Sequence, residues 1–126
     1  MSVVLDASAL LALLRGEAGS GQVASAIEGA CMCTVNWAEV VGRAVVHGAD
    51  PDLLEREMLA LGLSFEAFTS SMASTAGKLR PLTRPHGLSL GDCACLALAL
   101  DKRLPVLTAN RIWRELQLDL DVRLVR

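Results

Sequence analysis

Short apolar runs alternate along the chain with longer segments whose apolar residues recur every three to four positions. Residues 3–5 are apolar and β-branched, and good helix formers follow them up to Leu14, which predicts a buried strand leading directly into a helix. The same alternation predicts further strands at 31–35, 63–65, 105–107 and 122–125, and further helices at 19–28, 36–47, 50–61, 66–79, 89–102 and 110–115. Two prolines bound a predicted loop at 81–87. This pattern favours an α/β fold with a mainly parallel sheet between helices.

Length and composition narrow the class of protein. The 126 residues are expected to form a single domain over 1–126. Although hydrophobic residues make up 52% of the chain, no apolar run reaches the roughly 18 residues of a membrane helix, and no basic region precedes an apolar stretch at the N-terminus. We therefore expect a cytoplasmic protein with no membrane association. The mean hydropathy of +0.42 predicts a surface covered by a partner, with the helices at 9–14 and 50–61 as candidates.

Charge and cysteine usage exclude some functions. A net charge of −2 argues against binding nucleic acid by broad electrostatic attraction, so such a partner would need locally supplied positive charge. Cys31 and Cys33 alternate on a predicted strand and should share one face, whereas Cys93 and Cys95 lie two apart on a predicted helix. Neither pair has the spacing of zinc ligands, so we expect four buried thiols.

Acidic side chains recur where predicted strands end and helices begin. Asp6 directly follows the first strand, and ligands of open α/β sheets bind beyond the carboxyl ends of strands. Glu39 stands three residues after Asn36, Asp92 stands three residues after Ser89, and Asn110 follows the fourth strand. Each of these positions is also typical of a helix cap or a capping box, so either interpretation stays open for each residue taken alone.

Taken together, the acids predict a metal site. The carboxyl ends of parallel strands meet at one edge of a sheet, which would bring Asp6 and the turn before Asn110 together, with Glu39 and Asp92 nearby. Clustered carboxylates repel one another and raise their pKa values unless a cation lies between them. Oxygen ligands without histidine favour Mg²⁺ or Mn²⁺, and such sites perform metal-assisted hydrolysis of phosphodiesters.

The stretches that carry these residues resemble the motifs of PIN-domain ribonucleases, in particular the VapC-type toxins of bacterial toxin–antitoxin pairs. They are residues 3–9, 36–39, 88–94 and 106–110, and their order, their spacing and the total length all match. The resemblance implies a three-layer α/β/α sandwich and an endoribonuclease that depends on Mg²⁺, with Mn²⁺ as a substitute. It also implies a cognate antitoxin and a homodimer as partners, and RNA as the substrate.

The resemblance also assigns roles to individual residues. It implies Asp6, Glu39 and Asp92 as the catalytic acids, with Asp6 and Asp92 assigned to the metal. The residues at secondary positions of the site are Ser8, Thr108 and Asn110. The family usually has an aspartate where this chain has Asn110, and an amide brings no charge. The alternative function is therefore a PIN-like module that binds RNA or protein with weak or no cleavage.

Other chemistry has less support in the sequence. Arg84 and Arg111 are candidates for contacts with RNA phosphates, although a solvated surface position is an equal alternative for each. A ribonuclease built on His47 and His86 is disfavoured because neither histidine has a sequence partner. A receiver-like phosphoacceptor domain would need an acidic pair beside the first strand and a lysine after a late strand, and the chain has neither.

Overall fold

Five short parallel strands form one sheet in the computed structural model, which describes residues 2–126. Their order across the sheet is β3-β2-β1-β4-β5. The strands are β1 (Val4–Leu5), β2 (Cys31–Cys33), β3 (Ser64–Glu66), β4 (Val106–Thr108) and β5 (Val122–Leu124). The first strand of the chain is therefore central, with β2 on one side and β4 on the other. This confirms the predicted α/β fold with a parallel sheet.

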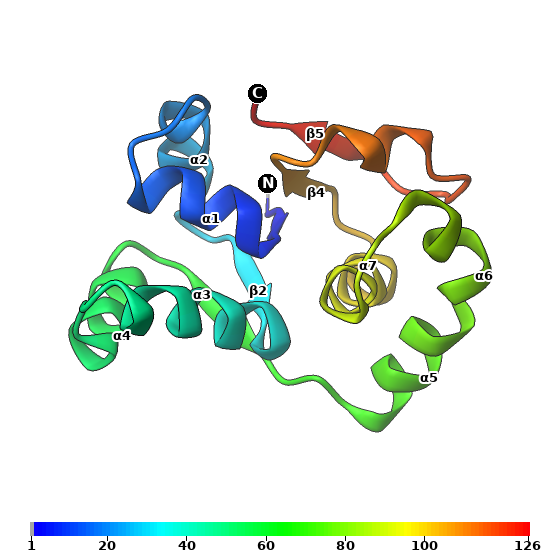
Figure 1. Cartoon of the computed structure of the whole chain (residues 1–126), viewed down its shortest axis with the longest axis horizontal. Coiled ribbons are helices and arrows are strands. Elements are labelled where there is room, and N and C mark those ends of the chain that lie inside the picture. Colours follow the sequence, from blue (N-terminus) through cyan, green and yellow to red (C-terminus); the bar gives the residue numbers. More distant parts are fainter. Residues whose placement is uncertain (1) are drawn as a thin grey trace.

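Helices cover both faces of the sheet and complete three layers (Figure 1). On one face lie α1 (Ala7–Leu14), α2 (Ser20–Ala26), α3 (Thr34–Val46) and α4 (Pro51–Ala60). On the other lie α5 (Ser70–Lys78), α6 (Arg80–Thr83), α7 (Leu90–Lys102) and two short 3₁₀ helices, η1 (Arg84–His86) and η2 (Arg111–Glu115). Successive strand residues point to opposite faces, so Leu5, Met32 and Leu107 pack in the first layer while Val4 and Val106 pack in the second.

The most apolar predicted helix is also the most buried. Every residue of α7 from Cys93 to Ala99 is buried, because the helix packs against the sheet on one side and against α5 and α3 on others. Cys31 and Cys33 point to this same side, as predicted from their alternation. Trp113 of η2 is completely buried in this layer and anchors the segment that follows β4. No helix within residues 2–126 has the length and apolar character needed to cross a membrane.

Two predicted boundaries near the second strand are wrong. The strand ends at Cys33, and α3 begins at Thr34 rather than at Asn36, because Cys33 has the extended backbone of an N-cap residue. Asn36 is therefore the third residue of the helix and does not cap it. The interpretation of Asn36 and Glu39 as a capping box fails for this reason, and both side chains are free to act elsewhere.

Two further predictions fail after the third strand. This strand extends through Glu66, and the next helix begins only at Ser70, where the Thr69 hydroxyl accepts a hydrogen bond from the Met72 N–H at 3.2 Å. The predicted loop at 81–87 instead contains α6 and η1. Both prolines occupy the first turn of a short helix, where the missing N–H has no intrahelical partner to lose.

Candidate active site

Asp6 lies at the carboxyl end of β1, in the middle of the sheet edge. It is the N-cap of α1, and its Oδ1 accepts a hydrogen bond from the Ala9 N–H at 2.8 Å. The Thr108 hydroxyl donates to Oδ2 at 2.6 Å, and the Ser8 hydroxyl lies 2.8 Å from Oδ1 and 2.9 Å from Oδ2. Pairing of β1 with β4 brings Thr108 to this point, so a hydrogen bond joins two residues that lie 102 positions apart in the sequence.

The two hydroxyls also bind the turn that follows β4. The Ser8 oxygen accepts a hydrogen bond from the Ala109 N–H at 2.9 Å, and the Thr108 oxygen accepts one from the Asn110 N–H at 3.1 Å. Each hydroxyl can therefore direct its own hydrogen toward Asp6. This network fixes the orientation of the Asp6 carboxylate and joins the ends of the two central strands.

Burial raises the pKa of Asp6. The residue is only 3% exposed, and removal from water raises its pKa from 3.8 to about 6. The hydrogen bonds from Thr108, Ala9 and Ser8 oppose this change, whereas the negative charge of Asp92 adds to it. The hydrogen bonds only partly offset the cost of burying the charge. A cation beside Asp6 would stabilise the ionised form.

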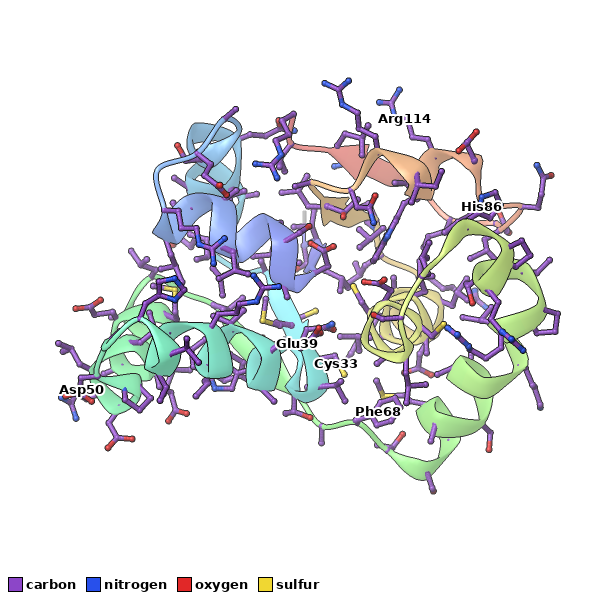
Figure 2. The ribbon with its side chains drawn as sticks, in the orientation of Figure 1. Cys33, Glu39, Asp50, Phe68, His86 and Arg114 are labelled. Carbon is purple, nitrogen blue, oxygen red and sulfur yellow. The ribbon has the colours of Figure 1, made fainter. Side chains whose placement is uncertain are left out.

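Glu39 is held between α3 and α7 by a buried amide. Asn36 is 1% exposed, and its Nδ2 donates to Glu39 Oε1 at 3.0 Å and to the Gly91 carbonyl oxygen at 3.0 Å. A Cβ at position 91 would lie 2.5 Å from Glu39 Oε1, so the glycine leaves room for the Glu39 carboxylate at its observed position. Figure 2 shows Glu39 near the middle of the view, between α3 and α7, and the residue is exposed.

Asp92 has the capping role that its spacing from Ser89 predicts. The Ser89 hydroxyl accepts a hydrogen bond from the Asp92 N–H at 3.2 Å, while Asp92 Oδ2 accepts one from the Ser89 N–H at 2.8 Å. Asp92 caps the helix through Oδ2, and within residues 2–126 its Oδ1 accepts no hydrogen bond. Asp92 can therefore cap α7 and still use Oδ1 for a second role.

A polar cavity of about 160 Å³ brings the predicted acids together. It is lined by Asp6, Ala7, Ser8, Leu11, Glu39, Arg43, Asp92 and Asn110. The structure therefore places all three predicted catalytic acids, and two of the three secondary residues, around one space. Thr108 is buried and does not line this cavity, but its hydroxyl contacts two residues that do, Asp6 and Ser8.

Arg43 is the residue that our sequence analysis missed. It lies four positions after Glu39, which is the spacing that places two side chains on the same side of a helix. That spacing is the pattern that could have revealed it. Arg43 places a positive charge at the wall of an acidic cavity, and it also lines an apolar groove on the neighbouring surface.

Of the three remaining predicted site residues, one lines the acidic cavity and two lie elsewhere. Asn110 lines the cavity and also caps η2, where its Oδ1 accepts a hydrogen bond from the Ile112 N–H at 3.2 Å. Arg84 lines a surface hollow formed by α6 and η1, and Arg111 lines a hollow beside the end of β5. Neither of these two arginines lines the acidic cavity.

The donor set suits a hard divalent cation. The polar groups of the cavity wall, apart from Arg43, are three carboxylates, one amide and one hydroxyl. Such oxygen donors match Mg²⁺ or Mn²⁺ rather than zinc or copper. Within residues 2–126 no three acidic, histidine or cysteine side chains lie close enough to form a complete metal site as they stand. The buried, weakly acidic Asp6 is the observation that fits a bound cation best.

Comparison with known proteins identifies related folds. A family model described as the PIN domain matches residues 3–118. A chain of the DNA-bound VapBC from Salmonella typhimurium has a TM-score of 0.75 and 16% identity, covering 100% of this chain and 99% of that chain. A chain of a toxin–antitoxin complex from Klebsiella pneumoniae has a TM-score of 0.69 and 23% identity, covering 86% of each chain.

A third solved structure carries an activity in its name. The sarcin–ricin loop cleaving toxin VapC20 of Mycobacterium tuberculosis has a TM-score of 0.66 and 13% identity, and the match covers 90% of this chain and 94% of that one. At these identities the likeness establishes a shared fold. No curated protein matches the chain.

Proposed function

The chain belongs to the PIN-domain family, and on that premise we propose that it is a divalent-metal-dependent endoribonuclease and the toxin of a toxin–antitoxin pair. One observation carries the proposal. Asp6, Glu39 and Asp92 come from three separate segments of the chain, yet all line one small cavity at the carboxyl edge of the sheet. PIN domains are typically nucleases that bind divalent metal, and the solved structures with this fold include VapC toxins.

In this proposal Asp6, Glu39 and Asp92 hold Mg²⁺ or Mn²⁺. When bound, the cation supplies Lewis acidity to the phosphodiester and to the attacking water. The surrounding residues fix the three acids in position. Ser8 and Thr108 orient Asp6, Asn36 holds Glu39 against α7, and the capping box fixes Asp92.

Arg43 supplies the local positive charge that RNA binding requires in a chain of net charge −2. A guanidinium forms paired hydrogen bonds with phosphate oxygens, and such contacts are stronger than those between neutral groups. We assign Arg43 to the phosphate of the bound RNA because it lies in the wall of the same cavity as the three acids.

An apolar groove of about 310 Å³ supports the proposal of an antitoxin partner. It lies among α1, α3 and α4, and its apolar side chains include Leu11, Leu14, Ala44 and Leu54. Leu14 in the groove wall is 38% exposed, so a partner that filled the groove would remove apolar surface from water. We propose that an apolar segment of the antitoxin binds here. The predicted helices at 9–14 and 50–61 both contribute, and α3 adds a third wall.

Self-association belongs to the same proposal. Val45 and Val46, on the last turn of α3, are exposed, as are Leu59 and Leu61 at the end of α4. A second copy that covered these side chains would remove apolar surface from water. Light scattering at micromolar concentration should show a dimer, and a monomer under these conditions would exclude the homodimer without affecting the nuclease assignment.

The proposal is tested with a fluorescently labelled RNA in Mg²⁺, in Mn²⁺ and in EDTA. We expect cleavage only with metal, and we expect Asp92→Asn to reduce the rate by at least about 100-fold. Asparagine can still accept the capping hydrogen bond, so circular dichroism should show an unchanged fold. Full cleavage in EDTA would overturn the proposal.

Asn110 favours one second candidate function. Its neutral amide caps η2 and adds no charge to the cavity, so the chain could bind RNA without cutting it. This binding module would retain RNA without producing fragments in Mg²⁺ or Mn²⁺. The same assay therefore separates the two candidates.

A further inference from the structure

A second polar hollow, of about 540 Å³, lies near the carboxyl ends of β4 and β5. It is lined by Gln22, Arg111, Arg114, Leu124, Val125 and Arg126. Three of the six lining residues are arginines, and none is acidic. We call these six residues the arginine hollow. In a chain with a net charge of −2, such a concentration of positive charge requires an explanation.

The arginine hollow adjoins the acidic cavity. Thr108 pairs with Leu124 across the parallel strands β4 and β5, so both strands end at the same edge of the sheet. Asn110 lines the acidic cavity, and Arg111 is the next residue along the chain. A ligand that leaves the cavity past Asn110 on the side of β5 therefore meets the arginine hollow.

The arginines are arranged for contact with a ligand. Arg111 and Arg114 are exposed and stand three residues apart in the 3₁₀ helix η2, which places them on the same side of it. Figure 2 shows Arg114 at the edge of the molecule, near η2 and β5. Trp113 lies between them and is fully buried, so it holds their backbone in place.

The guanidinium groups of these three arginines form few interactions with the described part of the protein. Within residues 2–126, Arg111 and Arg114 take part in no ion pair. Arg126 approaches Glu17 at 3.5 Å, with each side chain 39% exposed. An ion pair this open to solvent contributes little and can give way to a stronger anion.

We propose that the arginine hollow binds the backbone phosphates of a single RNA strand as it extends from the acidic cavity toward β5. This inference rests on the proposed ribonuclease function, because it takes the scissile bond to lie in the acidic cavity. Arginine binds phosphate in paired hydrogen bonds, and phosphate contacts fix the position of a strand without reading its sequence. The arginine hollow thus guides the strand and leaves the choice of bond to the acidic cavity.

The test is RNA binding measured without cleavage. Fluorescence anisotropy of a labelled 20-nucleotide single-stranded RNA is recorded in EDTA from 50 to 200 mM KCl. The triple variant carries Arg111→Gln, Arg114→Gln and Arg126→Gln. We expect it to bind at least tenfold more weakly at 50 mM KCl, and we expect the slope of log K against log salt to fall by about 2, since each phosphate contact contributes roughly 0.7.

A control triple variant separates local contact from net charge. Arg56→Gln, Lys78→Gln and Lys102→Gln remove the same three charges from exposed positions on α4, α5 and α7. We expect this control to keep the wild-type slope and to weaken binding by less than twofold. Circular dichroism on both triple variants verifies that each is folded.

The possible outcomes are distinct. Equal slopes for the wild type and the arginine variant would overturn the inference, as would an absence of salt-dependent RNA binding by the wild type. A 20-base-pair DNA duplex that loses affinity as strongly as the RNA would also overturn it, by indicating a duplex partner. Failure of the proposed function is seen separately, as absence of cleavage of the same RNA in Mn²⁺.

Discussion

Exchanging Asp6 for asparagine should change how the stability of the protein depends on pH. In the native chain the pKa of Asp6 rises from 3.8 to about 6 through burial. The folded state therefore binds a proton more tightly than the unfolded state does, and stability falls as pH rises from about 4 to about 6. The free energy of unfolding should fall by about 3 kcal/mol in total, because each tenfold change in the acid dissociation constant of Asp6 corresponds to about 1.4 kcal/mol.

Asp6→Asn removes this titration while it keeps the N-cap of α1, because an asparagine oxygen can still accept from the Ala9 N–H. The variant loses an acceptor for the Thr108 hydroxyl, at a cost of about 1 kcal/mol that does not vary with pH. As pH rises from 4.5 to 8, the free energy of unfolding of the variant should increase by about 2 kcal/mol relative to that of the wild type.

The assay is urea unfolding in EDTA across this pH range, followed by the fluorescence of the buried Trp37 and Trp113. Asp50→Asn is the control, because Asp50 also caps a helix but does so in solvent. A stability difference between Asp6→Asn and the wild type that stays constant with pH would refute the argument, since burial would then not shift the pKa of Asp6.

Three further substitutions test the site. Gly91→Ala should change the free energy of unfolding by no more than about 1 kcal/mol, because the atom that the new Cβ meets is the mobile end of Glu39. It should slow RNA cleavage by about 100-fold, because the Glu39 carboxylate is displaced. Normal cleavage would show that the position of this carboxylate is unimportant. Asn110→Asp should tighten Mn²⁺ binding by roughly tenfold in calorimetry and raise the cleavage rate, since it adds charge to the ligand set while still capping η2; equal affinity would mean that this residue is only a cap. Arg43→Gln should reduce the slope of RNA affinity against salt by about 0.7, and an unchanged slope would remove Arg43 from the RNA interface.

The sequence predicted the fold well because its strongest patterns are local. The short strands, the apolar helix that follows Ser89 and the helix that begins after Asp50 all form within two residues of their predicted bounds. Errors arose where a tertiary contact decides the boundary. Asn36 has the chemistry of a cap, yet its amide bridges Glu39 of its own helix and Gly91 of α7, and α3 begins two residues earlier.

The candidate site was predictable as a set of residue types at strand ends, but its geometry was not. Parallel pairing of β1 with β4 accounts for the meeting of Asp6 and Thr108, and this follows from the α/β pattern. Burial of Asp6 depends on how closely the surrounding elements pack, which no local pattern gives. Arg111 was predicted as a contact for RNA phosphates, but its grouping with Arg114 and Arg126 was not, since the arginine hollow joins a 3₁₀ helix to the C-terminal residues.

In the proposed function Asp6, Glu39 and Asp92 form one divalent-metal centre. Titration calorimetry with Mn²⁺ on the wild type and on Asp6→Asn, Glu39→Gln and Asp92→Asn measures this binding. The wild type should bind one Mn²⁺ ion at the site, and each of the three variants should bind it at least about tenfold more weakly while remaining folded. The same Mn²⁺ affinity in the wild type and in all three variants would show that these carboxylates do not hold the metal.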